Sequence, residues 1–99
     1  MDSVTVDISI AQFLDSIRRS RSINTYKTYK NGLALFTQSL KSKDIETDIL
    51  PVSDLTEDSV SHFADFLKDL APSSERLYLT AVTSFYEYLA AEKLAEVNL

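Results

Sequence analysis

Glycine and proline are scarce in this sequence, and their scarcity constrains the fold more than any other feature. The 99 residues include one glycine and two prolines, so few positions carry the residues that mark tight turns between strands. Apolar side chains instead recur three and four positions apart, which is the spacing of one face of an α-helix. A chain of this length, 44% apolar, can bury one modest core. The sequence therefore predicts a single all-α domain over residues 1–99.

Four stretches carry this helical spacing, and together they predict a compact four-helix bundle. The expected helices cover about residues 9–19, 24–40, 57–70 and 74–92. Ser9, Thr56 and Ser73 precede the apolar positions and are the expected N-caps. The side chains expected in the core are Ile10, Phe13, Leu14, Ile17, Tyr26, Tyr29, Leu33, Phe36, Leu40, Val60, Phe63, Ala64, Leu67, Leu70, Tyr78, Ala81, Val82, Phe85 and Leu89.

Two features between and within these helices bear on packing. Residues 41–55 are polar and acidic around Pro51 and predict a loop, which Ile45, Ile49 and Leu50 can attach to the core. Gly32 interrupts the second helix at a cost of about 1 kcal/mol relative to alanine. A close helix crossing is a structural reason for a glycine at that position.

Charge is distributed very unevenly along the chain. Up to Lys43 there are seven Lys and Arg against three Asp and Glu, a net of +4, and from Asp44 onward three against twelve, a net of −9. The overall charge of −5 argues against a strongly basic nucleic-acid binder. Any cationic surface must therefore come from the first half of the chain.

The basic residues of that half gather around the start of the second helix, where Thr-Tyr-Lys occurs twice in succession. On a helix this repeat places Tyr26 and Tyr29 on one flank and Lys27 and Lys30 on the adjoining flank. Arg18, Arg19 and Arg21 precede it, interleaved with hydroxyl side chains that can bind phosphate. On charge alone the cluster favours a solvated junction whose arginines compensate a helix dipole, and it is also compatible with a phosphate-binding surface.

Several blocks of the sequence resemble the N-terminal core-binding, SAM-like domain of the tyrosine recombinases, the phage integrase family. Asn24-Thr25, followed by Tyr29, Leu33 and Phe36, is similar to the second helix of that domain. LTEDSVSHFADFL resembles its third helix and SSERLYLTAVTSFYEYLAAEKLAEVN its fourth. The resemblance runs from about Ile8 to Asn98, where Leu99 stands in place of the proline of the family's linker.

The resemblance implies a module that grips double-stranded DNA while a separate C-terminal domain, expected to be absent from this chain, cuts it. No residue here inherits a catalytic role, because the family's tyrosine nucleophile lies beyond the linker. The second and fourth helices of the family face the duplex. The DNA-binding residues implied on these and the adjacent arginines are Arg19, Arg21, Thr25, Lys27, Thr28, Lys30, Asn31, Arg76, Thr80, Thr83 and Ser84. Basic residues of the family are replaced by Leu77, Thr83 and Ser84 on the fourth helix.

Composition also bears on metal and cofactor sites and on the expected location of the protein. There is no cysteine, and His62 is the one histidine, so neither a metal site nor a cofactor is expected. The acidic start and the lack of a long apolar run predict neither a signal peptide nor a membrane span, and cytoplasm is the expected location. The isolated domain is expected to be a monomer, and a recombinase tetramer on DNA would add contacts between protomers.

Two other functions stay open. The chain could be a helical protein-interaction module that binds a basic partner through its acidic half, or a stand-alone DNA-binding regulator that uses the second helix for recognition. A free-standing enzyme has the least support, because no nucleophile, base and orienting group cluster in the sequence.

Overall fold

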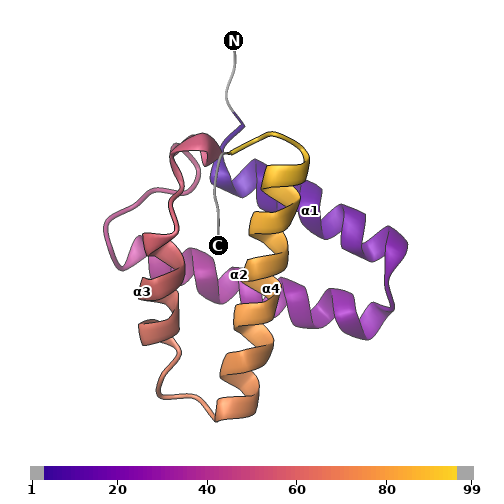
Figure 1. Ribbon diagram of the computed structural model, residues 1–99, viewed down its shortest axis with the longest axis vertical. Coiled ribbons are helices and arrows are strands. Elements are labelled where there is room, and N and C mark those ends of the chain that lie inside the picture. Colours follow the sequence, from indigo (N-terminus) through magenta and orange to yellow (C-terminus); the bar gives the residue numbers. More distant parts are fainter. Residues whose placement is uncertain (1–3, 96–99) are drawn as a thin grey trace.

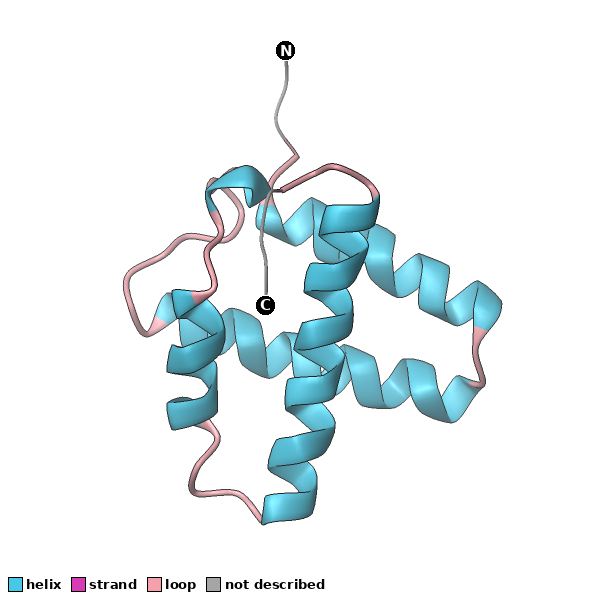
Figure 2. Ribbon diagram, in the orientation of Figure 1, coloured by secondary structure: helices cyan, strands magenta, loops and turns pink. Residues whose placement is uncertain are grey.

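The computed structural model describes residues 4–95 and shows four α-helices joined by loops (Figure 1). The elements are α1 (Val6–Ser20), α2 (Ile23–Lys41), the short 3-10 helix η1 (Val52–Asp54), α3 (Asp58–Phe66) and α4 (Pro72–Ala91). Residues 4–95 contain no strand, as Figure 2 shows, and the predicted all-α four-helix fold is confirmed. The expected linker residues Asn98 and Leu99 lie outside the described residues.

The bundle is organised around the crossing of α2 and α4. In Figure 1, α4 passes in front of α2, while α1 and α3 pack on opposite sides of the crossing. Gly32 is buried there, and a Cβ atom at its position would lie 3.1 Å from Ala81 Cβ and 3.2 Å from Tyr78 Cδ1. The close helix crossing expected at Gly32 is therefore confirmed.

Aromatic rings fill the core on both sides of this crossing. Phe13 of α1 lies with its ring centroid 5.5 Å from Phe85 and 5.3 Å from Tyr88 of α4. On the α3 side, Phe36 packs edge-on at 5.4 Å from Phe63. Among the residues predicted for the core, the following are buried: Ile10, Phe13, Ile17, Leu33, Phe36, Leu40, Phe63, Leu67, Ala81, Val82, Phe85 and Leu89.

The other side chains predicted for the core lie at its rim. Leu14, Tyr26, Tyr29, Val60 and Tyr78 are half-buried against the core. Ala64 is also half-buried. Leu70 is 41% exposed because it follows the end of α3 instead of continuing the helix.

The three predicted N-caps are wrong. Thr5 caps α1 by accepting a hydrogen bond from the Ile8 amide on its Oγ1 at 3.2 Å. Ser9 lies inside the helix and donates to the Val6 carbonyl at 2.9 Å. The N-cap of α3 is Glu57 and that of α4 is Ala71, where Pro72 occupies the first helical position because its fixed φ suits a helix start.

The loop after α2 explains why α1 begins earlier than predicted. The amides of Val6 and Asp7 donate to the carbonyls of Leu50 and Thr47, each at 3.0 Å, and Val52 donates to Val4 at 2.8 Å. These loop carbonyls satisfy amides that lack partners at a helix start. Sequence periodicity cannot reveal such partners, because they lie forty or more residues away in the chain.

Two of the three residues expected to attach this loop to the core do so, and two further residues join them. Ile45 and Leu50 are half-buried, as expected, but Ile49 is 65% exposed. The anchors that sequence reasoning missed are Val52 and Leu55, which are 2% and 3% exposed. The 3-10 turn of η1 places both side chains toward the core.

We expect Gly32→Val to lower the free energy of unfolding by at least about 2 kcal/mol, because the new methyl groups would push α2 away from the backbone-fixed Cβ of Ala81. Ala34→Val is the matched control, since Ala34 is exposed on the same helix and should lose only about 0.5 kcal/mol of helix propensity. Urea unfolding measures both variants. Equal losses would contradict the importance of the crossing.

We also expect Tyr86 to make the fold sensitive to alkaline pH. Burial raises the pKa of its hydroxyl above the ordinary value of 10.0, and the hydroxyl donates to the Thr56 carbonyl at 2.7 Å. The unfolded chain therefore loses this proton first, so the stabilisation is complete below pH 10 and falls as the pH rises above it.

Urea unfolding at neutral and alkaline pH tests this expectation. Tyr86→Phe should cost about 1 kcal/mol at neutral pH through the lost hydrogen bond and should reduce the alkaline decline. If the unmodified domain and Tyr86→Phe lose the same stability at alkaline pH, the loss arises from groups other than Tyr86.

Candidate nucleic-acid interface

The second helix carries no acidic residue along its whole length, Ile23–Lys41. Ser22 caps it and accepts a hydrogen bond from the Thr25 amide on its Oγ at 3.1 Å. The first turn has no Asp or Glu to compensate the positive end of the helix dipole. The start of α2 is therefore favourable for an anion.

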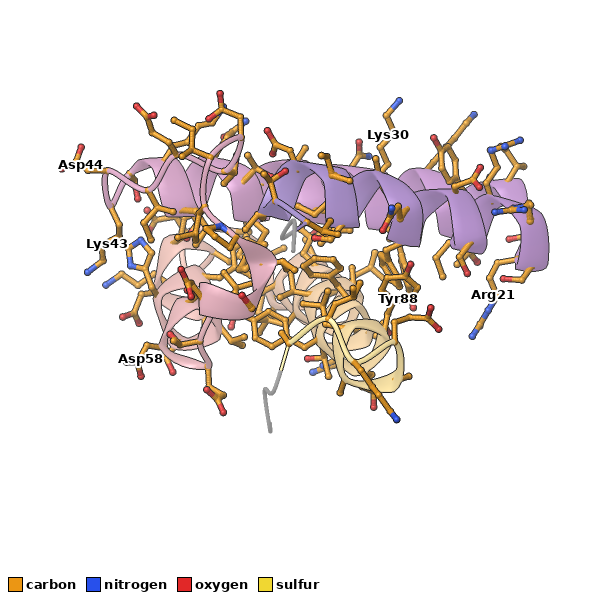
Figure 3. All side chains as sticks on the ribbon, turned by 90° about the horizontal axis from the view of Figure 1, so that it is seen from above. Arg21, Lys30, Lys43, Asp44, Asp58 and Tyr88 are labelled. Carbon is orange, nitrogen blue, oxygen red and sulfur yellow. The ribbon has the colours of Figure 1, made fainter. Side chains whose placement is uncertain are left out.

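Lys27 and Lys30 lie on the side of α2 that faces away from α4. The buried residues Leu33 and Phe36 mark the core side, and at 100° per residue Lys27 points opposite to them. Figure 3 shows Lys30 pointing away from α4. Asn31 is exposed beside Lys27. We call Lys27, Lys30 and Asn31 the lysine flank.

Thr25 and Thr28 lie on a different side of α2 from the lysines. They precede Gly32 by seven and four positions, so they share its helix side, and both are half-buried. The predicted DNA-binding residues of α2 thus divide into two groups. One group points away from α4 and the other lies beside the crossing.

Thr25 and Thr28 lie next to α4, in the angle between α2 and α4. Tyr29 Oη lies 3.4 Å from Ser84 Oγ, which places the Ser84 flank of α4 beside the first half of α2. Leu77 lies seven positions before Ser84 on the same flank and is 47% exposed. We define the α2–α4 corner by Thr25, Thr28, Leu77, Thr80 and Ser84.

The outward stripe of α4 is less cationic than the start of α2. A shallow hollow along it is lined by Pro72, Glu75, Arg76, Leu79, Thr80, Thr83, Ser84 and Glu87. Two carboxylates therefore accompany a single arginine. Thr80 already donates its hydroxyl proton to the Arg76 carbonyl at 2.9 Å, so in this rotamer it can only accept a hydrogen bond.

The arginines at the end of α1 differ in their surroundings. Arg18 and Arg19 both pair with Asp15, Arg18 at 2.8 Å. The hydrogen bond from Arg18 and the charges of both arginines hold the Asp15 pKa below its usual value. Sequence reasoning missed Asp15, although its spacing of three and four from the arginines predicts such pairs.

Arg21 lies beyond this pairing. It follows α1 as the C-cap residue and is exposed. In Figure 3 its side chain points to the side on which α4 lies, opposite to Lys30. Figure 3 places Asp44 and Asp58 at the far end of the molecule, together with Lys43.

The remaining polar side chains do not assemble a reaction centre. His62 Nε2 lies 3.1 Å from Ser42 Oγ, and burial raises the pKa of Tyr86 and Tyr88, which both pack in the aromatic core. Among residues 4–95, no three His, Cys, Asp or Glu side chains are grouped to hold a metal ion. None of the helices in this range is long and apolar enough to cross a membrane.

The four helices make up a small all-α domain, and its sequence places it in a known family. Residues 10–93 match the family model for the N-terminal SAM-like domain of phage integrase. The chain belongs to this family, and the resemblance seen in the sequence is confirmed.

A solved structure supports the fold independently. The N-terminal domain of a phage integrase/site-specific recombinase from Haloarcula marismortui superposes with a TM-score of 0.81 at 16% identity, covering 97% of this chain and 90% of that one. No curated protein matches the sequence significantly.

We expect Arg18→Gln plus Arg19→Gln to raise the Asp15 pKa toward its ordinary value of 3.8, because both cations that favour the carboxylate are removed. Titration of the labelled carboxyl carbon by NMR measures the change. Arg21→Gln is the control and should leave the Asp15 pKa unchanged, since the ion pairs of Asp15 are with Arg18 and Arg19. An unchanged pKa in the double variant would show that neither pair persists in solution.

Proposed function

We propose that this domain is the DNA-binding module of a site-specific tyrosine recombinase and that it clamps the recombination site during DNA integration or recombination. Its membership in the phage integrase family supports this proposal. The observation that carries it is the arrangement around α2. This helix has no acidic residue, and its Tyr29 hydroxyl lies beside Ser84 of α4. The Arg21 side chain, which precedes α2, points to the side on which α4 lies.

The duplex, in this proposal, rests against the α2–α4 corner. Thr25 and Thr28 approach it from α2, and Arg76, Thr80, Thr83 and Ser84 from α4. Arg21 contacts phosphate at the edge of this surface, and Arg19 does so when its pair with Asp15 opens. The lysine flank faces away from the corner, so Lys27, Lys30 and Asn31 contribute attraction at longer range or reach the neighbouring backbone.

In this proposal, the acidic half of the chain determines which side of the domain faces DNA. Phosphate repels the carboxylates at the end that carries Asp44 and Asp58, so this end faces away from DNA. With few cations at the corner, we propose weak binding by the isolated domain and a shallow dependence on salt.

An amide chemical-shift titration with a short mixed-sequence duplex at low salt tests the proposal. We expect shifts confined to Arg18 through Asn31 and Arg76 through Ser84. Arg76→Glu should weaken binding more than Lys68→Glu, which makes the same charge change on an exposed residue beyond α3. Loss of one phosphate contact should lower the logarithmic salt slope by about 0.9.

The lysine flank is tested in the same titration. Lys27→Glu plus Lys30→Glu should weaken binding more than Lys43→Glu plus Lys93→Glu, a pair of exposed lysines with the same total charge change. If the two double variants weaken binding equally, Lys27 and Lys30 act only through the overall charge of the domain. Shifts on α3 and the acidic loop, or none at all, would contradict DNA binding.

The proposal extends to the whole recombinase. We propose that cleavage is carried out by a catalytic domain that follows this module, that protomers touch within a tetramer on DNA, and that the protein acts in the cytoplasm as a monomer until it binds. A reading frame that continues past Leu99 with the family's arginine, histidine and tyrosine residues would support this. A stop codon there would favour a stand-alone regulator.

A second candidate function is a protein-interaction module. The net charge of −9 from Asp44 onward favours a basic partner. Shifts that map to the acidic end on addition of a basic peptide, with none on addition of DNA, would select it.

A further inference from the structure

Leu77 is an exposed apolar side chain in otherwise polar surroundings. It is 47% exposed and is the one large apolar residue of α4 with a side chain open to solvent. Its neighbours on the outward side of the helix are Arg76 and Thr80, and Ser84 lies two turns further along the same flank. Fold stability does not require an exposed leucine here, because the core side of α4 is filled by Val82, Phe85 and Leu89.

The position of Leu77 relative to α2 is fixed by two contacts. Gly32 approaches Ala81 closely, and Tyr29 Oη lies 3.4 Å from Ser84 Oγ. These contacts hold the Leu77 flank beside the first half of α2. The leucine therefore lies on the corner that the proposed function assigns to the duplex, and not on the acidic end of the molecule.

The chemistry of the corner is suited to one feature of the major groove. Hydroxyl groups bind phosphates and the polar edges of bases, and a guanidinium binds phosphates or guanine, but a leucine can gain only from an apolar contact. The C5-methyl group of thymine is the apolar group that a base presents in the major groove. A lysine at this position would bind phosphate without regard to sequence.

We infer that Leu77 is a specificity-determining residue that contacts a thymine methyl group in the major groove, so that the domain prefers A·T pairs at the position facing the start of α4. This inference rests on the proposed DNA-binding function. It assigns base discrimination to the apolar member of the corner, while Arg76 and the hydroxyl groups hold the phosphate backbone.

Uracil provides a direct test because it pairs as thymine does but lacks the methyl group. Fluorescence anisotropy at low salt compares a 20-base-pair A·T-rich duplex with the same duplex carrying uracil at every thymine. We expect the unmodified domain to bind the uracil duplex about fourfold more weakly for each methyl contact. Leu77→Ala should bind both duplexes equally, with the thymine duplex bound more weakly than by the unmodified domain.

Leu70→Ala is the matched control, since Leu70 is an exposed leucine of similar accessibility that precedes α4. It should retain the full preference for thymine. Circular dichroism verifies that both variants fold, as expected for exposed positions. Selection from a randomised duplex pool gives a second measurement, in which enrichment of thymine at one position should disappear with Leu77→Ala.

The outcomes separate the inference from the function on which it rests. Equal binding of both duplexes by the unmodified domain, or an undiminished preference in Leu77→Ala, would overturn the role of Leu77 while DNA binding stands. Absence of binding to either duplex would overturn the proposed function and this inference together.

Discussion

The close contact of α2 with α4 at Gly32 is the constraint on which the rest of the structure depends. Without a Cβ at this position, α2 approaches the backbone-fixed Cβ of Ala81 closely enough for aromatic side chains to pack on both sides of the crossing. Phe13 and Phe85 join α1 to α4, and Phe36 and Phe63 join α2 to α3. A crossing that leaves an open angle between two helices also creates the α2–α4 corner. Packing and the candidate interface therefore have a common origin.

Basic and acidic side chains are distributed unevenly over this small domain. Five of the ten basic residues lie between Arg18 and Lys30, where α1 is followed by α2, and twelve of the fifteen acidic residues follow the end of α2, so the proposed interface lies on the more cationic part of the chain. Part of the positive charge is held within the domain, because Asp15 pairs with Arg18 and Arg19. The cationic charge available to an anion at the proposed interface is thus smaller than a count of arginines suggests.

The interface is built mainly from short side chains, and this affects what it can discriminate. The hydroxyl groups on Thr25, Thr28, Thr80 and Ser84 are short and carry no net charge. Some of them already bond within the protein, as Thr80 does with the Arg76 carbonyl. If this surface binds DNA as proposed, base discrimination depends on shape and on the few side chains with a distinct chemistry. Leu77 is the one that differs most from its neighbours.

The sequence by itself determined the all-α class, the four helices, most of the core and the family, because helical periodicity and the order of the blocks are local properties of the chain. Tertiary structure decided where α1 starts, since the amides of Val6 and Asp7 find partners in a loop forty or more residues away. It also decided which predicted DNA-binding residues share a surface. Lys27 and Thr28 are adjacent in sequence, yet the crossing at Gly32 leaves one facing away from α4 and the other beside it, because only packing defines which side of a helix is enclosed.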